Sequence, residues 1–200
     1  MKRNGFFVQF CIIAWILLCV TGCATISTEE RTKNEIQAIR EGRFFQQSFS
    51  YVDPALPIEQ HSAIYIAKEF GFTPVNRIDG KKPNQDISGP GGKGTQPGRV
   101  IFLPPGTHSF KVQWTGHGDS NYVFDLGNDF IPGHSYAMIT DWEKYRYESE
   151  RNLIFKITTR IIDLGDTELE AIPTNDVSVF YPVADILEGI GVLREKYKNK

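Results

Sequence analysis

The stretch that decides the fold runs from Arg99 to Trp114 and reads RVIFLPPGTHSFKVQW. Its second half alternates, because Phe110, Val112 and Trp114 share one face of an extended chain while polar residues occupy the positions between them. A Pro-Gly pair precedes this half and is typical of a turn, since Pro fixes φ and Gly accepts a positive φ. The stretch therefore predicts two short strands joined by a turn, and the second strand has one face in a core and one in water.

Runs of the same kind recur from His61 onward. They are rich in β-branched and aromatic residues, and Gly, Pro, Asn and Asp separate them. About seven such runs without a long helix among them favour an antiparallel β-sandwich over a parallel α/β sheet. We therefore expect a mainly β fold, with the sandwich over residues 61–165. The predicted strands are His61–Lys68, Pro74–Asp79, Arg99–Leu103, His108–Trp114, Tyr122–Leu126, Ser135–Asp141 and Leu153–Ile162.

A C-terminal extension, residues 166–200, follows the predicted strands. Its stretch Pro182–Lys198 has apolar residues at helical spacing. We expect one amphipathic helix here that packs on the sandwich.

The segment before the strands is polar, and two interpretations of it stay open. One is a short tether helix between Thr28 and Glu41, in which Ser27 and Glu30 have the spacing of a capping box and Gly42 would be the C-cap. The other is a disordered spacer, since the apolar stripe of such a helix is thin. In both, the segment separates the folded part from the membrane.

The composition is that of an ordinary globular domain. The 200 residues include 22 basic and 24 acidic ones, for a formal net charge of −2, and 40% are hydrophobic. A nucleic-acid-binding protein usually has a basic face, and no cluster of Lys and Arg in the sequence would form one. We therefore expect no nucleic-acid partner.

The N-terminus has the features of a secretory signal peptide, residues 1–22. Lys2 and Arg3 precede an apolar run from Phe6 to Val20, and no acidic residue interrupts it. The run is short for a membrane-spanning helix, which needs about 20 apolar residues.

The residues Val20, Thr21, Gly22 and Cys23 resemble the lipobox of bacterial lipoproteins. This resemblance implies cleavage before Cys23 by signal peptidase II, acyl chains on Cys23, and a segment 23–60 of lipidated cysteine and tether. Several acyl chains together give stable anchoring. Ala24 follows the cysteine where an aspartate would retain the protein in the inner membrane, so the resemblance implies an outer-membrane lipoprotein that faces the periplasm.

A second resemblance rests on turn chemistry. Ile78-Asp79-Gly80-Lys81, the later run Val100–Val112 through its Pro-Gly turn, and a similar turn at Pro132-Gly133 are similar to the PEGA-type domains of bacterial envelope proteins. In that family these elements are framework. The resemblance therefore implies a small β-sandwich and no particular activity.

Residues 80–98 form a long stretch dense in Gly and Pro between two predicted strands. Loops of this length without secondary structure are usually functional or disordered. We expect this loop to be a partner-binding segment, with Lys81, Lys82 and Lys93 as its candidate contacts.

The sequence has none of the common catalytic patterns. It contains no nucleophile elbow, and its four histidines have no metal-ligand spacing. We therefore expect no enzyme activity, no metal and no cofactor, and we favour a non-catalytic lipoprotein that binds another envelope protein. The alternative is a glycan- or small-solute-binding lipoprotein that uses Trp114, Trp142 and Tyr145, although core packing employs the same residue types. An envelope hydrolase ranks third.

Overall fold

The structure is a computed structural model, and it describes residues 27–44, 46–67, 72–82, 98–115, 121–149, 152–173 and 180–200. The chain divides into two units, Met1–Lys33 and Asn34–Lys200. In the described part of the first unit, the Ser27 Oγ accepts a hydrogen bond from the backbone N–H of Glu30 at 3.2 Å. That bond caps the start of a helix. None of the helices in the described ranges is long and apolar enough to span a membrane.

The fold is mainly β with a C-terminal helix, which confirms the coarse expectation from sequence. All seven predicted strands are present, and β7 is much longer than its predicted range. The elements are α2 (Thr28–Arg40), β1 (Gln46–Ser48), η1 (Ile58–Gln60), β2 (Ser62–Ala67), β3 (Phe72–Ile78), β4 (Gly98–Leu103), β5 (Gly106–Thr115), β6 (Asn121–Phe130), β7 (Ser135–Ser149), β8 (Asn152–Asp163), β9 (Ala171–Pro173), β10 (Phe180–Pro182) and α3 (Val183–Lys198).

The strands form three sheets. The largest has the order β1-β4-β2-β7-β8, a smaller one has the order β3-β5-β6, and β9 pairs with β10. The expectation of an all-antiparallel arrangement is wrong for the large sheet, because β1 pairs with β4 and β2 pairs with β7 in parallel. The whole small sheet lies between β2 and β7 in the chain order, and this long crossover allows the parallel pairing.

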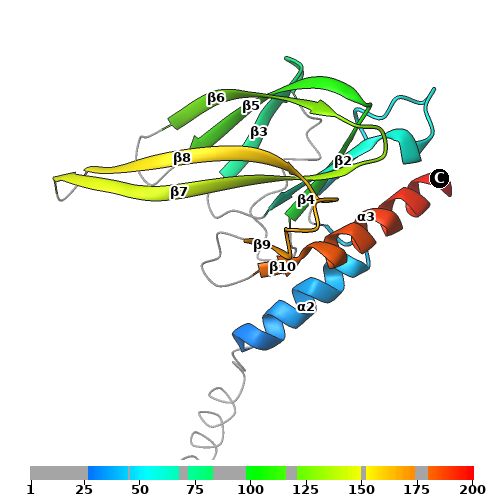
Figure 1. The fold of residues 1–200 in the computed structure, drawn as a ribbon, viewed down its shortest axis with the longest axis horizontal. Helices are drawn as coiled ribbons and strands as arrows, with labels where there is room; N and C mark the ends of the chain where they lie inside the picture. Colours follow the sequence, from blue (N-terminus) through cyan, green and yellow to red (C-terminus); the bar gives the residue numbers. More distant parts are fainter. Residues whose placement is uncertain are drawn as a thin grey trace, which may run out of the picture. The chain divides into compact units, whose positions relative to one another are not determined.

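The strands β2 and β4 of the large sheet are buried on both faces. Alternate residues of β2 separate into two apolar clusters, with Tyr65 in one and Ile64 in the other. The first cluster joins this sheet to α2 and α3, and the second joins it to β3, β5 and β6. In Figure 1 the two helices and the small sheet accordingly lie on opposite sides of the large sheet. Burial on both faces explains why β2 and β4 are continuous apolar runs.

The C-terminal half of α2 belongs to the folded unit. Gly42, at φ +63°, ends the helix in a Schellman motif, since the N–H of Arg43 donates to Ala38 O at 2.8 Å. The Arg40 Nε donates to Asp185 Oδ1 of α3 at 2.6 Å, and the pKa of Arg40 is raised by this bond and by the charge of Asp185. The second unit of the chain, which contains this contact, begins at Asn34.

Candidate functional site

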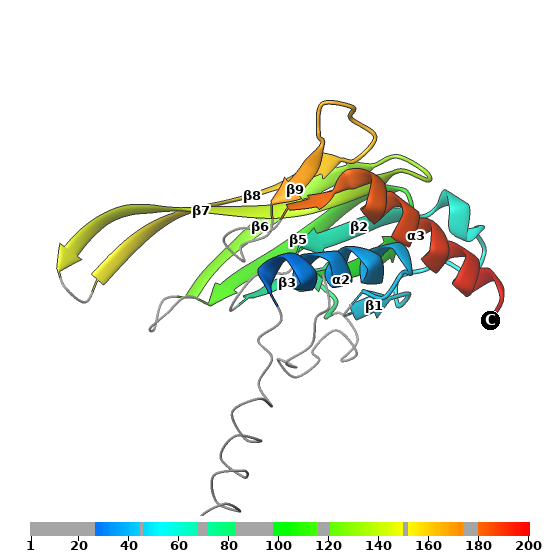
Figure 2. The same cartoon turned by 90° about the horizontal axis from the view of Figure 1, so that it is seen from below.

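The last two strands of the large sheet continue beyond their neighbours. The strand β2 pairs with β7 only from Ser135 to Met138. Beyond Met138, β7 pairs with β8 alone among the described strands, down to Ser149 opposite Asn152. Figures 1 and 2 show this two-stranded ribbon running past the other strands of its sheet. We call residues 139–149 and 152–160 the arm.

The strand β8 is also the terminal strand of the large sheet, so no described strand pairs with its outer side. Natural edge strands are commonly protected by Pro, by bulges or by being very short. The opposite edge, β1, has three residues, whereas β8 has 12, and its sequence NLIFKITTRIID contains neither Pro nor Gly. Its pairing with β7 has two register shifts, between Lys144 and Arg146 and between Tyr147 and Ser149, and its sequence carries the charged residues Lys156, Arg160 and Asp163. Its outer side is therefore a long surface for another strand.

Other edges of the sheets are less regular. In the small sheet, β3 contains Pro74 and a register shift between Thr73 and Arg77. The strand β6 contains Gly127 together with Asp125 and Asp129. Gly, Pro and inserted charges weaken pairing along an edge. The outer edge of β8 is therefore the best surface for strand addition among the described strands.

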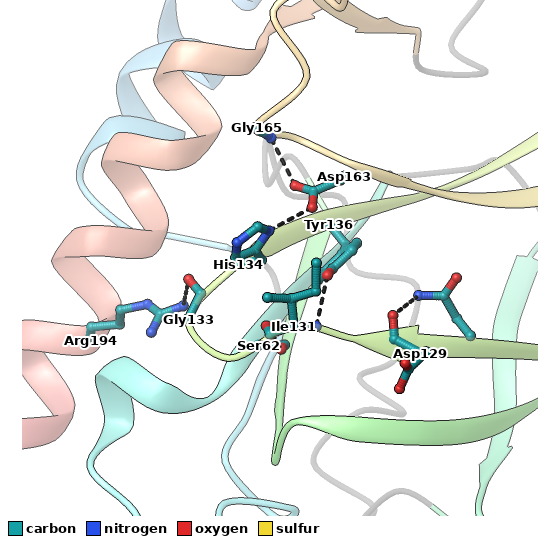
Figure 3. Close-up of polar contacts among 10 residues, drawn as sticks. Ser62, Asp129, Ile131, Gly133, His134, Tyr136, Asp163, Gly165 and Arg194 are labelled. Atoms are coloured by element: carbon teal, nitrogen blue, oxygen red, sulfur yellow. Dashed lines mark hydrogen bonds and ion pairs between the residues drawn. The ribbon is translucent and has the colours of Figure 1, made fainter.

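Polar contacts fix the base of the arm, where β7 begins and β8 ends (Figure 3). The His134 Nδ1 lies 2.7 Å from Asp163 Oδ2, and the N–H of Gly165 donates to Asp163 Oδ1 at 2.9 Å. Since a carboxylate only accepts, Nδ1 of His134 carries the proton in this contact. We call His134, Asp163, Tyr136, Ile131 and Arg194 the arm root. This hydrogen bond joins the residue before β7 to the last residue of β8.

The turn between β6 and β7 is held by several hydrogen bonds. The Ile131 N–H donates to the Tyr136 hydroxyl at 3.0 Å, and the Ser62 hydroxyl donates to Ile131 O at 2.7 Å. Burial raises the pKa of Tyr136, the N–H of Ile131 opposes that shift, and the charges of Asp163 and Asp129 add to it. Tyr136 therefore stays a neutral phenol that both packs in the core and orders the turn.

Arg194 links the arm root to α3. Its Nη1 donates to Ile58 O at 2.8 Å, its Nη2 donates to Gly133 O at 3.2 Å, and its guanidinium lies 5.6 Å from the centre of the Phe102 ring. Burial lowers the pKa of Arg194, and the charge of Glu59 partly offsets that effect. The helix, η1 and the turn are thus joined by one side chain, so the arm rests on a rigid base.

The described histidines serve structural contacts. His61 accepts the N–H of Asp53 at Nε2, at 2.9 Å, and its Nδ1 lies 3.0 Å from Pro57 O. His108 has acceptors at both ring nitrogens, Asp79 Oδ2 at 2.7 Å and Pro104 O at 2.9 Å. Only the half-exposed His134 presents a ring nitrogen without a partner in the described part of the chain. His117 lies outside the described residues.

His134 beside Asp163 has the orientation of a catalytic or metal-binding imidazole, but such chemistry needs further groups. No cluster of three or more His, Cys, Asp or Glu that could hold a metal ion exists among the described residues. Asp163 is already committed to Gly165 and His134. The contacts of His134 and Asp163 connect the start of β7 with the end of β8.

The structure describes two of the three predicted loop lysines. Lys81 is exposed and closes the Asp79-Gly80 turn through paired backbone hydrogen bonds with Ile78, both 2.9 Å. Lys82 is also exposed. Lys93 and the lipobox residues Val20, Thr21, Gly22 and Cys23 lie outside the described residues.

The three aromatic residues proposed for glycan binding lie on strands whose side chains are not described at those positions. Trp114 is opposite Tyr122 in the β5–β6 pair, and Trp142 is opposite Ile157 in the β7–β8 pair. Tyr145 lies at a register shift between Lys144 and Arg146. The glycan-binding role of these three aromatic residues therefore stays a prediction.

Sequence reasoning missed both the arm and its root. The alternation of β7 breaks at the charged residues after Asp141, so residues 142–149, about half of this 15-residue strand, carried no strand signal. His134 and Asp163 are 29 residues apart, and no local pattern pairs them. The sequence offered one signal for the arm root: a histidine follows a Pro-Gly pair in two turns, His108 after Pro105-Gly106 and His134 after Pro132-Gly133.

Comparison with known proteins found no match, whether against protein-family models, curated proteins or solved structures.

Proposed function

We propose that this chain is a lipid-anchored, non-catalytic interaction module of the bacterial cell envelope, which binds a partner protein through the outer edge of β8. The observation that carries the proposal is the 12-residue edge strand without Pro or Gly, mounted on a fixed root. An exposed edge recruits an extended segment by main-chain hydrogen bonds, and this mode requires no sequence motif.

The arm adds a second reason to expect a partner. An isolated two-stranded ribbon is only marginally stable in water. A third strand on the outer side of β8 would turn the ribbon into a sheet and satisfy its outward backbone groups. The root already holds the ribbon in place, so less conformational entropy is lost when a partner binds.

The cellular setting is inferred from the sequence. The lipobox-like residues Val20 to Cys23 support acylation at Cys23, and Ala24 supports delivery to the outer membrane with the domain in the periplasm. The two sheets that share an apolar cluster are compatible with the β-sandwich implied by the PEGA-like turns. That family likeness supports a framework role and no catalysis.

A pair of proline variants tests the edge. Successive residues of a strand place their N–H groups on opposite sides, so of Thr158 and Thr159 one donates toward β7 and the other toward the outer edge. The Thr159 hydroxyl also shares a hydrogen bond of 2.9 Å with the Thr140 hydroxyl, so each proline variant is compared with the valine variant at the same position. The proline that costs less relative to its valine variant is the one that has lost only an outward donor. Thr158→Val and Thr159→Val are the matched controls, since both keep the N–H.

The readout is recovery of a partner after mild crosslinking in membranes. We expect the stable proline variant to lose the partner and both valine controls to keep it. Equal partner recovery by the stable proline variant and by its valine control would contradict the proposal.

A further inference from the structure

The chain between β1 and η1, residues 49–57, belongs to no described strand or helix. We call this segment the strap. Phe49 and Val52 pack against the first apolar cluster, and the Phe49 ring stacks on that of Phe102 in β4 with centres 5.0 Å apart. Tyr51 packs against the second cluster. The strap therefore contacts apolar side chains of both clusters, next to the edge strand β1 of the large sheet.

Few hydrogen bonds hold the strap in place. The bonded backbone groups of residues 51–57 pair within the strap or with Gln60 and His61, and none pairs with a strand among the described residues. The Tyr51 hydroxyl is buried and has no hydrogen-bond partner in the described part of the chain. Such a hydroxyl disfavours the docked position of its segment, and burial together with the charge of Asp79 raises its pKa. The strap is therefore held by apolar contacts and by its bonds to Gln60 and His61.

His61 joins the strap to the residue that precedes β2. The side chain of His61 is fully buried, its Nε2 accepts the N–H of Asp53 at 2.9 Å, and its Nδ1 lies 3.0 Å from Pro57 O. Because Nε2 is an acceptor in this contact, the ring carries its proton on Nδ1 and is neutral. A second proton, on Nε2, would point at the N–H of Asp53. The docked strap and a charged His61 therefore exclude each other.

The charged and titratable groups on the elements around His61 have other partners. They are Asp53, which accepts the N–H of Ala55, Glu59 with Lys198, Arg194 with the carbonyls of Ile58 and Gly133, His134 with Asp163, and His108 with Asp79. None of these side chains hydrogen-bonds to a ring nitrogen of His61, since the partners of both nitrogens are backbone groups. His108, in contrast, has an acceptor at each nitrogen and can hold a second proton without losing a bond. Among these histidines, His61 is thus the one whose protonation breaks a hydrogen bond of its own.

We propose that the strap is a proton-sensitive latch, which docks while His61 is neutral and opens when His61 takes up a proton. Opening withdraws Val52 from the first apolar cluster and Tyr51 from the second, and it exposes the apolar side chains that these residues cover. The latch lies at the β1 edge of the large sheet, opposite the β8 edge, so it is independent of the proposed partner site. It makes the exposure of apolar surface at the β1 edge depend on pH.

Hydrogen exchange of the full-length chain in detergent tests the latch. The reporters are the amides of Val52, Asp53, Ala55 and Leu56, which all donate hydrogen bonds in the docked strap. An exposed histidine takes up a proton below about pH 6.5. Since opening then binds one proton, protection of these amides, corrected for the pH dependence of free amides, should fall about eightfold from about pH 6 to about pH 5. Protection of β2 should stay constant over the same range.

Three variants identify the group that responds. His61→Gln keeps a side-chain acceptor for the N–H of Asp53 but cannot become charged, so it should abolish the fall in protection. His108→Gln is the matched control and should keep the fall. Tyr51→Phe removes the unsatisfied hydroxyl and should raise the protection of the strap at about pH 7.

The comparison of the strap with β2 in the parent chain decides the matter even where His61→Gln does not fold. Equal strap protection at about pH 6 and about pH 5 would overturn the proposal. So would an equal fall in His61→Gln, or a fall in β2 that matches the fall in the strap.

Discussion

The contact between α2 and α3 allows a quantitative test of the fold, because two glycines of α3 differ sharply in their surroundings. A Cβ on Gly189 would lie 2.1 Å from Ile39 O and 3.0 Å from the Phe44 ring, whereas a Cβ on Gly191 would meet nothing within 4 Å. The first close contact is with backbone, so α2 as a whole would have to move. Gly189→Ala and Gly191→Ala therefore make the same chemical change in two different environments.

The two substitutions should have opposite signs. Overpacking costs about 1–3 kcal/mol and often more against backbone, while Gly to Ala inside a helix gains about 1 kcal/mol. We expect Gly189→Ala to lower the free energy of unfolding by about 2 kcal/mol net, and Gly191→Ala to raise it by about 0.5–1 kcal/mol. For a domain of this size, the Tm should fall by about 4–8 °C in the first variant and rise by about 2–3 °C in the second.

The assay is urea and thermal unfolding of the chain from Ser27 to Lys200, followed by circular dichroism. A Gly189→Ala variant as stable as the parent chain would refute the close approach of α2 and α3. It would also remove the argument that α2 is fixed to the folded unit.

Three further predictions concern other contacts. Tyr181→Phe should lower the free energy of unfolding by about 1–3 kcal/mol, because Glu35 loses a buried donor; an unchanged urea midpoint would contradict this. At Asp79, burial raises the pKa, but hydrogen bonds from Ser109 and His108 outweigh it, so the pKa lies below its ordinary value of 3.8. The Asp79 carboxylate therefore contributes its full stability above that pH, and this contribution is lost as the pH falls below it. Between about pH 5 and about pH 2, the Asp79→Asn variant should lose less stability than the parent chain does. Parallel acid profiles of the variant and the parent chain would contradict this. Cys23→Ala should abolish incorporation of labelled fatty acid, and continued labelling would exclude Cys23 as the anchor.

Local patterns were sufficient for most of the strands and for the C-terminal helix. The alternation around Phe110 and Val112 places both residues in the core, at 1% exposure each. The Asp79-Gly80 pair forms a turn with φ values of +48° and +73°, as such a sequence favours. In these cases the local preference and the tertiary contacts agree.

The pairing of strands was beyond sequence reasoning, because it depends on contacts between distant residues. The three residues of β1 carry no periodic signal and form a strand only beside β4. The parallel pairing of β2 with β7 follows from where the small sheet packs, which no local pattern encodes. The root pair His134–Asp163 depends on the register of β7 with β8 for the same reason.

The most direct test of the central claim compares crosslinking at two exposed strand positions in living cells. Thr158 lies on the terminal strand β8, whereas Lys111 lies on β5, which has β3 and β6 on its two sides. We predict a specific protein adduct from a photo-crosslinker at Thr158 and none from Lys111. The same adducts at equal yield from both positions, or none from Thr158, would contradict a function through the outer edge of β8.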